Sequence, residues 1–328
     1  MSINKRLEIL ASCFAAWLLA AYCCSAFAQQ KIIIDTDIGD DIDDVFAVDL
    51  ALSSPELKIL GVMSAWGDTE LRSRMLDRLL CETGRSDIPV TTGVKTATTT
   101  TFSQEVWAKA GEAHTHADAV GFLLDQIRKN PDEITLLALA PLTNIGAAID
   151  RDPETFKKLK RVVLMGGSIR RGYGDFGLDA SRGPEAEYNI AMDPTAAQKL
   201  VRSGVPIYMM PLDSTQLKFD EVKRTMLTTV STPLTDSLQV LTAEWQRVAR
   251  QTTPTMFDAV AAAYAVKPEL CPVTPLHIEV DDKGFTREGP GAANVNVCLN
   301  SDSDQFFQFL MPRLLGQKLI GTSSCLGR

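Results

Sequence analysis

Residues 31–52 read KIIIDTDIGDDIDDVFAVDLAL, and this stretch decides the fold. The β-branched run at residues 32–34 is typical of a buried strand, and six aspartates follow it within the next ten residues. Carboxylates this close at the end of a buried strand repel one another unless a cation neutralises them or some stay protonated. Because the stretch contains no Cys or His, we predict a site for a hard, oxygen-liganded cation rather than for zinc.

A solvated helix cap is the alternative interpretation of these acids. A functional site is favoured by the order of the elements, in which a strand is followed by DxDxG, by DD and then by an apolar helix. This order places the acids where open α/β sheets bind ligands. Gly39 allows the backbone to turn back toward a helix that begins near Asp43. The N-terminus of that helix also favours negative charge.

Apolar strand-like runs alternate with segments of helical periodicity along the chain. The expected strands are residues 32–34, 57–63, 134–139, 161–165 and 205–209, and the expected helices are residues 45–52, 71–80, 119–128, 142–149 and 194–201. This alternation predicts an α/β fold with a mostly parallel sheet, helices on both faces and ligands at the carboxyl ends of the strands. Residues 276–280 and 294–298 are expected to form a hairpin appended to this core.

The first 28 residues have the pattern of a secretory signal peptide. Lys5 and Arg6 precede an apolar run at residues 9–22, and Ala26 and Ala28 supply the small residues that cleavage requires. A membrane anchor is the alternative. We therefore expect residues 29–328 to form one domain that is exported to the periplasm or the medium, without membrane attachment after cleavage.

The remaining composition limits the partners and the redox state. A net charge of −8 and a pI near 5.1 give no basic surface for nucleic acid, which favours a small-molecule ligand. Four cysteines lie after the expected signal, at positions 81, 271, 298 and 325, and allow three pairings. Cys271 with Cys298 is the preferred pair, since they bracket the expected hairpin; buried free thiols are the alternative.

The acidic stretch resembles the DxDxGxDD signature of the inosine-uridine preferring nucleoside hydrolases, lengthened here by two residues. Further strings resemble this family: LALAPLTN at residues 137–144, MGG at 165–167, AEYN at 186–189 and FDAVA at 257–261. The resemblance spans residues 31–298 and implies hydrolysis of the N-glycosidic bond of ribonucleosides with bound Ca²⁺. It also implies a homodimer or homotetramer.

The resemblance assigns roles to individual residues. The expected Ca²⁺ ligands are Asp37, Asp44, the carbonyl of Leu139 and Asp258, with Asp37 also the base that takes a proton from water. The expected substrate-binding residues are Asp43, Asp68, Met165, Glu187, Asn189 and Phe257. From pattern alone, Asp68 and Asp258 would be helix N-caps and Glu187 a solvated charge.

The group that helps the base leave is the open question. Phe257 stands where many relatives carry a His acid. Phe257 and Trp66 could stack on a purine, which would favour purine nucleosides. His114 or His116 could instead reach the substrate, although two solvated loop histidines are the simpler interpretation.

Two other classes of protein share part of this pattern. A haloacid-dehalogenase-type phosphatase also begins with a strand and DxD, but needs a later Lys and an acidic pair on another strand. A secreted nucleoside-binding or sugar-binding protein derived from the hydrolases would keep the ribose and Ca²⁺ ligands while losing the acid. Turnover separates the binding protein from an enzyme.

Overall fold

The computed structural model describes residues 29–176, 183–319 and 325, so the expected signal at residues 1–28 lies outside the described part. Its centre is a nine-stranded sheet in the order β4-β3-β2-β1-β5-β6-β7-β11-β8. All neighbouring strands of this sheet are parallel except β8, which runs antiparallel to β11. The bounds are β1 Gln30–Thr36, β2 Leu57–Ser64, β3 Val90–Thr92, β4 Ala117–Asp118, β5 Thr135–Ala138, β6 Arg161–Met165, β7 Ile207–Met210, β8 Val273–Leu276 and β11 Val295–Cys298.

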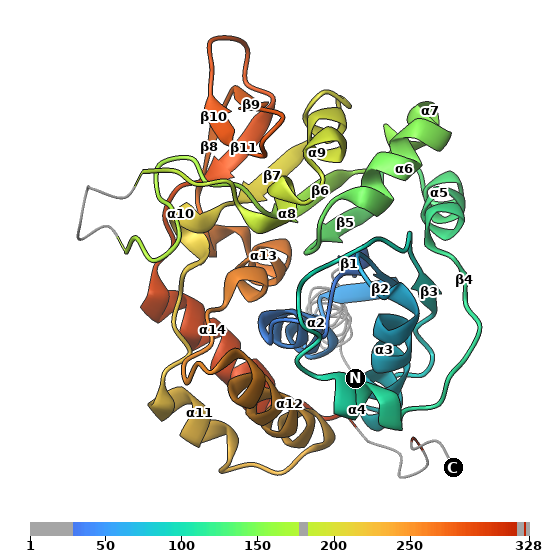
Figure 1. The fold of residues 1–328 in the computed structure, drawn as a ribbon, viewed down its shortest axis with the longest axis vertical. Coiled ribbons are helices and arrows are strands. Elements are labelled where there is room, and N and C mark those ends of the chain that lie inside the picture. Colours follow the sequence, from blue (N-terminus) through green and yellow to red (C-terminus); the bar gives the residue numbers. More distant parts are fainter. Residues whose placement is uncertain (1–28, 177–182, 320–324, 326–328) are drawn as a thin grey trace, which may run out of the picture.

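Helices cover both faces of the sheet (Figure 1). They are α2 Asp43–Leu52, α3 Thr69–Glu82, α4 Glu105–Ala110, α5 Ala119–Lys129, α6 Thr143–Arg151, α7 Pro153–Phe156, α8 Tyr188–Ala191, α9 Pro194–Val201, α10 Leu212–Thr215, α11 Glu221–Leu227, α12 Pro233–Ala249, α13 Phe257–Val266, η1 Pro268–Leu270 and α14 Ser303–Gly316. The α/β class predicted from the alternation of strands and helices is therefore confirmed.

The isoleucines of β1 show how the strand serves two cores at once. Ile32 and Ile34 belong to the core formed with α2, α12, α13 and α14, whereas Ile33 belongs to the core formed with α5, α6 and α9. This division follows from the two-residue repeat of a strand, which sends successive side chains to opposite faces. A strand buried on both faces reads as an unbroken apolar run, as it does here.

Helix α2 is the most enclosed part of the chain. All ten of its residues are buried, and it contacts α13, α14 and β2. A helix that is apolar on every side is stable only inside the protein. The acids at its first turn are consequently held in the interior rather than on the surface.

The prediction of an appended C-terminal hairpin is right in the antiparallel pairing of the two segments, which meet at Leu276 and Val295, but wrong in the strand bounds and in the position outside the core. The expected strand at residues 276–280 is divided at His277 into β8 and β9, Ile278–Val280, and β9 pairs with β10, Thr286–Glu288, in a separate ribbon. Strand β11 lies inside the main sheet, between β7 and β8. The reason is burial, because Val295 and Val297 fill the core beside β7 instead of covering an outer edge.

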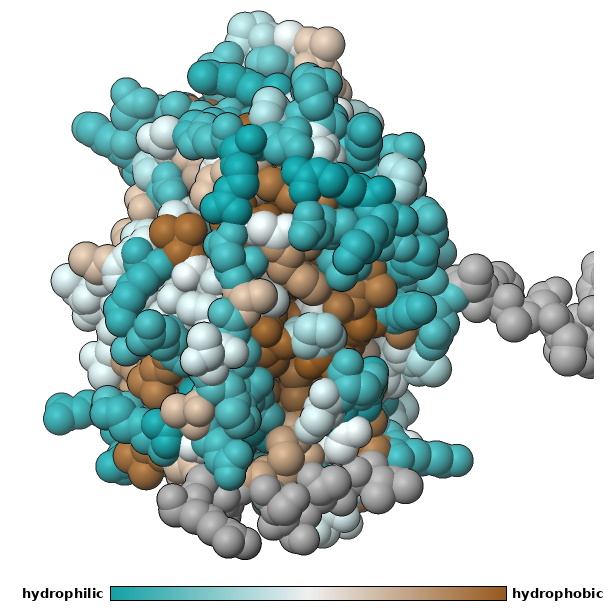
Figure 2. Space-filling model, turned by 90° about the vertical axis from the view of Figure 1, so that its right-hand side faces the viewer, coloured by the Kyte–Doolittle hydropathy of each residue, from teal (hydrophilic) through white to brown (hydrophobic). Residues whose placement is uncertain are grey.

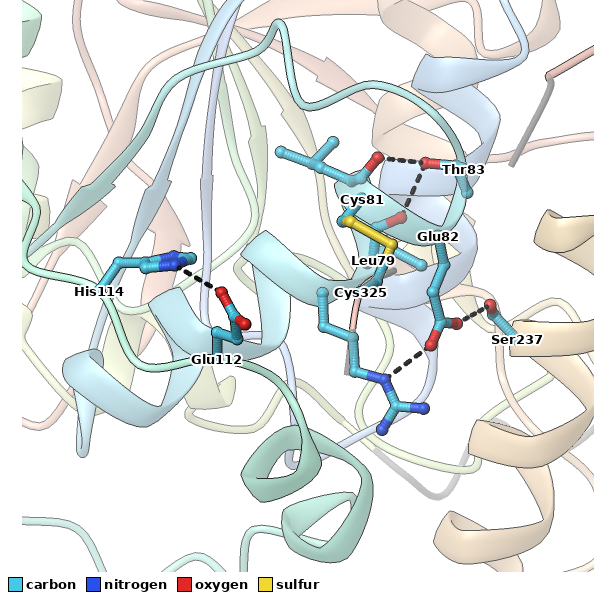
Figure 3. The surroundings of a disulfide bond; sticks show 10 residues. Leu79, Cys81, Glu82, Thr83, Glu112, His114, Ser237 and Cys325 are labelled. Atoms are coloured by element: carbon cyan, nitrogen blue, oxygen red, sulfur yellow. Dashed lines mark hydrogen bonds and ion pairs between the residues drawn. A yellow bond between two sulfur atoms is a disulfide. The ribbon is translucent and has the colours of Figure 1, made fainter. Parts of the chain in front are cut away.

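The described part of the chain contains two disulfides. The preferred pairing of Cys271 with Cys298 is confirmed, with 5.6 Å between the Cα atoms. The other pair is Cys81 with Cys325, with 5.7 Å between the Cα atoms (Figure 3). Both Cα separations are ordinary for a disulfide. The second disulfide attaches residue 325 to the last turns of α3.

The surface on the right-hand side of Figure 1 is mainly hydrophilic, with hydrophobic side chains gathered near its centre (Figure 2). Within the described ranges, the chain has no helix whose length and apolar character would let it cross a membrane.

Candidate active site

The acids of the opening stretch converge on the carboxyl end of β1. Asp35 is the next-to-last residue of the strand, Asp37 lies in the following turn, and Asp43 and Asp44 lie in the first turn of α2. All four are buried. The turn requires Gly39, because its φ is +123° and an added Cβ would meet the ring of Phe102 at 2.2 Å.

Asp258 joins these acids from a distant part of the sequence. It lies in the first turn of α13. Three carboxylate oxygens, one each from Asp43, Asp44 and Asp258, lie within 4.8 Å of one another. The backbone N–H of Asp258 donates a hydrogen bond to Oδ2 of Asp43 at 3.1 Å, and the hydroxyl of Thr36 donates one to Oδ1 of Asp44. Asp37 lies outside this group of three but faces the same cavity.

This cavity, called the acidic cavity below, has a volume of about 390 Å³. Its lining residues are Asp37, Asp40, Asp41, Asp43, Asp44, Thr100, Thr101, Ser103, Leu139, Met165, Tyr173, Glu187, Tyr188, Asn189, Trp245, Val248, Ala249, Gln251, Phe257 and Asp258. Nine of the ten site residues expected from the sequence are among them. The structure thus brings together segments from β1, β5, β6, α8, α12 and α13.

Asp68 is the exception. Trp66 and Gly67 both have positive φ, 59° and 62°, and this turn makes Asp68 the N-cap of α3. Its Oδ1 accepts a hydrogen bond from the N–H of Leu71 at 3.3 Å, and its side chain is 52% exposed beside Lys95. The structure thus places Asp68 as a helix cap outside the acidic cavity, the alternative that its pattern allowed.

Trp66, His114 and His116 also lie outside the lining of the acidic cavity. Trp66 is 9% exposed, and its ring is held in the core below the turn that it begins. Both histidines contact Asp77 on α3. Stacking of Trp66 on the base and proton donation by either histidine therefore have no support from the geometry.

A polar wall of the cavity is built around Glu187 and Asn189. The carboxylate of Glu187 accepts hydrogen bonds from the N–H groups of Gly167 at 2.9 Å, Asn189 at 2.9 Å and Ile190 at 3.2 Å. The side-chain amide of Asn189 donates to the carbonyls of Leu139 and Met165, each at 3.1 Å. Asn189 therefore ties the ends of β5 and β6 together and fixes the carbonyl of Leu139.

Aromatic and apolar side chains form another part of the lining, called the apolar wall below. Phe257 meets the ring of Tyr173 edge-on, with the ring centroids 6.2 Å apart and the planes at 80°. Trp245, Val248 and Ala249 of α12 continue this wall. No motif in the sequence marked Tyr173 or Trp245, because aromatic residues on a loop and on an amphipathic helix carry no distinctive spacing.

Burial raises the pKa of most of these acids. It raises the pKa of Asp35 to about 7, against a hydrogen bond from Asn144 that lowers it, and the pKa values of Asp44 and Glu187 to about 7. For Asp258, burial and then repulsion from Asp43 raise the pKa well above its usual range. The folded chain without a cation therefore holds several protons here near neutral pH.

Arg72 is a site residue that the sequence reasoning missed. Its fully buried guanidinium donates to the carbonyl of Ile38 at 2.9 Å, to Oδ2 of Asp40 at 2.8 Å, and also to the carbonyl of Asp37. Its Nε donates to the carbonyl of Trp66 at 2.8 Å. Arg72 thereby fixes the acidic turn after β1 against the turn after β2.

A signal for Arg72 does exist in the sequence. It lies three, four and seven residues before Met75, Leu76 and Leu79, on the apolar stripe of α3. A cation on an apolar stripe needs a buried acid, and the aspartate-rich turn supplies one.

The donor set fits a hard divalent cation. In the described part of the chain, six aspartates line the acidic cavity, at positions 37, 40, 41, 43, 44 and 258, against the charges of Arg72 and Lys218. Oδ2 of Asp35 and Oδ1 of Asp40 are buried with no hydrogen-bond partner among the described residues. Carboxylate and carbonyl oxygens without nitrogen or sulfur are the ligands that Ca²⁺ prefers.

A sequence model of the inosine-uridine preferring nucleoside hydrolase family matches residues 32–308. The chain belongs to this family. Its fold agrees with that of a plant nucleoside hydrolase, at a TM-score of 0.77 and 25% identity, over 88% of this chain and 99% of that one. A purine-preferring ribonucleoside hydrolase from Gardnerella vaginalis gives a TM-score of 0.73 at 25% identity, over 88% and 98% of the two chains.

Among curated relatives, the pyrimidine-specific ribonucleoside hydrolase of Citrobacter koseri is 28% identical over 316 residues, which cover 86% of this chain and 97% of that protein. This nucleoside hydrolase is therefore an enzyme that acts on N-glycosyl bonds and releases a base and ribose. The phosphatase alternative is excluded by the family match.

Proposed function

We propose that this nucleoside hydrolase uses one bound Ca²⁺ and slightly favours purine nucleosides. The observation that supports the metal is the meeting of Asp258 with Asp43 and Asp44 in one buried group of carboxylates. Asp37, Asp44, Asp258 and the carbonyl of Leu139 would hold the ion. Ca²⁺ bound there would orient the attacking water and lower its pKa.

Asp37 acts as the general base in this proposal. Its carboxyl group is buried at the cavity wall, and burial followed by repulsion from Asp44 raises its pKa well above the usual range. That raised pKa belongs to the metal-free chain; bound Ca²⁺ would lower it and keep Asp37 ionised, as a general base must be before it takes a proton. Water deprotonated by Asp37 attacks the anomeric carbon as the C–N bond breaks through an oxocarbenium-like transition state.

The polar wall would bind the ribose. Three N–H groups use three of the roughly four acceptor positions of the Glu187 carboxylate, which leaves one position for a sugar hydroxyl. Asn189 and Asp43 border the same space, and Met165 lies beside them at the end of β6. These contacts orient the sugar so that its anomeric carbon faces the water.

The apolar wall would hold the base. Phe257, Tyr173 and Trp245 present aromatic surface, which favours the larger ring system of a purine. A purine ring can accept a proton as it leaves, and this reduces the need for a protein acid at position 257. Uridine hydrolysis as fast as inosine hydrolysis would contradict the preference.

The test measures release of free ribose from inosine, adenosine, guanosine, uridine and cytidine, with Ca²⁺ and after chelation. We expect Ca²⁺-dependent release that is faster for the purine nucleosides. Asp37→Ala should lower kcat by about 100- to 10,000-fold, the range for loss of a general base, when assayed at saturating Ca²⁺. Undiminished activity after exhaustive chelation would contradict the metal assignment.

Export is proposed from residues 1–28. The two disulfides of the described chain support it, because such bonds persist in oxidising compartments. We propose removal of residues 1–28 and location in the periplasm or the medium. N-terminal sequencing of protein recovered from those fractions should begin at residue 29; a retained Met1 in the exported protein would contradict cleavage.

A homodimer or homotetramer is likewise proposed. The hydrophobic side chains at the centre of the surface in Figure 2 give one region that a second copy could cover. Light scattering coupled to size-exclusion chromatography tests this proposal, and a mass equal to that of one chain at all concentrations would contradict it.

A further inference from the structure

Two histidines and an aspartate meet on the outer side of α3. Nδ1 of His114 lies 3.0 Å from Oδ2 of Asp77, and Nε2 of His116 lies 2.8 Å from the same oxygen. The three ligand atoms all lie within 4.8 Å of one another. This histidine cluster, defined as Asp77, His114 and His116, is separate from the acidic cavity, whose lining includes none of the three.

The position of the cluster does not depend on the histidines alone. Arg74 of α3 donates through Nε to the carbonyl of Gly111 at 2.7 Å, and Arg78 donates through Nη1 to the carbonyl of Trp107 at 2.6 Å. The guanidinium of Arg78 also lies over the ring of Trp107, 4.0 Å from its centroid. These contacts hold the segment that carries the histidines against the helix that carries Asp77.

Glu112 occupies the position of an outer partner. Its Oε2 lies 3.4 Å from Nε2 of His114, the ring nitrogen that faces away from Asp77 (Figure 3). Metal-binding histidines commonly donate their second ring N–H to a carboxylate, which fixes the tautomer and strengthens the ligand. One ring nitrogen of His114 therefore already faces Asp77, where the ion would bind, while the other already faces the carboxylate of Glu112.

The cluster is accessible to an ion from solvent. The side chains of His116 and Asp77 are 10% and 21% exposed, and that of His114 is 53% exposed. His114 and His116 also line a second cavity of about 440 Å³, together with Asp68, Glu70 and Arg74. A solvent molecule in this cavity could complete the coordination of an ion.

We propose that Asp77, His114 and His116 bind one transition-metal ion of the zinc type. Two imidazole nitrogens and one carboxylate oxygen form a common ligand set for Zn²⁺, in contrast to the all-oxygen donors of the acidic cavity. Tetrahedral Zn²⁺ with bonds of about 2.0–2.1 Å places its ligands about 3.3 Å apart. The contacts of 2.8 and 3.0 Å to Asp77 would open by a few tenths of an ångström, and the two histidine nitrogens, now within 4.8 Å of each other, would take a similar spacing.

The ion would connect two parts of the chain that otherwise meet through hydrogen bonds. Asp77 belongs to α3, and the histidines end the segment of residues 93–116 that begins after β3. Thr100, Thr101 and Ser103 of this same segment line the acidic cavity. A metal ion bound at the histidine cluster would therefore restrain the C-terminal end of residues 93–116, a segment that also forms part of the wall of the acidic cavity.

The test is calorimetric titration of the purified mature chain with ZnCl₂, in excess Ca²⁺ and without reducing agent, so that the cysteines stay paired. The wild type should bind one equivalent. His116→Ala should abolish this binding, whereas His277→Ala, which changes a histidine on the distant β8–β9 connection, should retain it. Circular dichroism and ribose release check that both variants are folded.

Two further measurements separate a metal site from a set of hydrogen-bonded side chains. Glu112→Gln should weaken Zn²⁺ binding by about 10-fold, at the low end of the range for outer partners. Co²⁺ bound in place of Zn²⁺ should give the visible absorption of a four-coordinate site, and His116→Ala should remove it. The proposal is overturned if the wild type binds no Zn²⁺, or if His116→Ala binds it as well as His277→Ala does.

Discussion

The backbone N–H of Asp258 donates a hydrogen bond to Oδ2 of Asp43 at 3.1 Å, although 215 positions separate the two residues in the sequence. This bond joins the first turn of α13 to the first turn of α2. The N-termini of two ten-residue helices therefore point into the same cavity, and both favour negative charge there. The backbone itself thus helps to keep the carboxylates ionised once a cation is present.

Asp258→Asn tests whether the negative charge of this residue, rather than its shape, is needed for Ca²⁺ binding. The variant keeps the size of the side chain and the N–H that bonds to Asp43, but removes one carboxylate from the group. We expect Ca²⁺ binding to weaken by at least about 2 kcal/mol, roughly 30-fold. Isothermal titration with Ca²⁺ measures this change.

Asp49→Asn is the matched control for that experiment. Asp49 is a buried acid of α2 that does not line the cavity, and its carboxyl oxygens have no hydrogen-bond partner among the described residues. Its substitution should leave the Ca²⁺ affinity unchanged. Equal losses in both variants would mean that replacing any buried acid of this core, rather than removing a metal ligand, lowers the affinity.

Phe257→Ala should weaken nucleoside binding without affecting the metal. Loss of an aromatic surface that stacks on a base costs about 1–3 kcal/mol, so KM for inosine should rise roughly 5- to 100-fold. Phe176→Ala is the control, because Phe176 is 51% exposed and outside the cavity lining. An unchanged KM in Phe257→Ala would show that the base lies elsewhere.

Arg72→Met should destabilise the protein by about 3–5 kcal/mol, because the buried carboxylate of Asp40 loses its charged partner. Urea unfolding monitored by tryptophan fluorescence gives the free energy of unfolding. The double variant Arg72→Met with Asp40→Asn should recover part of the loss, since no unpaired charge remains. A double variant less stable than Arg72→Met would indicate that Arg72 acts mainly through the carbonyls of the turn.

The Ca²⁺-free protein should become less stable as the pH rises from about 4 to about 7. Burial raises the pKa values of Asp35, Asp44 and Glu187 to about 7 in the folded state, so in this window the folded chain binds more protons than the unfolded chain. Stability that depends on extra bound protons is present at low pH and lost as the pH passes through the folded pKa.

Melting temperatures of the chelated and Ca²⁺-loaded protein between about pH 4 and about pH 8 test this sign. The difference between the two forms should widen as the pH rises, because Ca²⁺ replaces the protons. A difference that narrows with rising pH would contradict the assignment of Asp44, the proposed ligand among these three acids, to the cation site.

Much of the fold was predictable because local pattern and burial agree. The apolar run of Ile32 to Ile34 indicates a buried strand, and the spacing of apolar residues in the amphipathic segments indicates helices. The position of β11 was not predictable in this way. Val295 and Val297 read equally well as an outer hairpin or as an inner strand, and only the open edge of β7 decides between them.

Site residues were predictable where one loop carries several acids or a sequence motif of the family. They were not predictable where a residue reaches the cavity only through tertiary packing. Asp68 follows a strand as the other acids do, but the positive φ of Trp66 and Gly67 turns it outward. Tyr173 and Trp245 reach the cavity through the packing of a loop and of α12. Periodicity does not encode such contacts, so residue spacing alone could not reveal them.

The Cys81–Cys325 disulfide closes a covalent ring of about three quarters of the chain, since 244 of its 328 positions separate the two cysteines. A single peptide-bond cleavage anywhere within that ring opens it without releasing a fragment. The buried aspartates before residue 81 and Asp258 would therefore remain in one molecule after one proteolytic cut. A nicked enzyme would run as an intact chain on a non-reducing gel and separate into two fragments only after reduction, so this disulfide would let the acidic cavity survive a single cut.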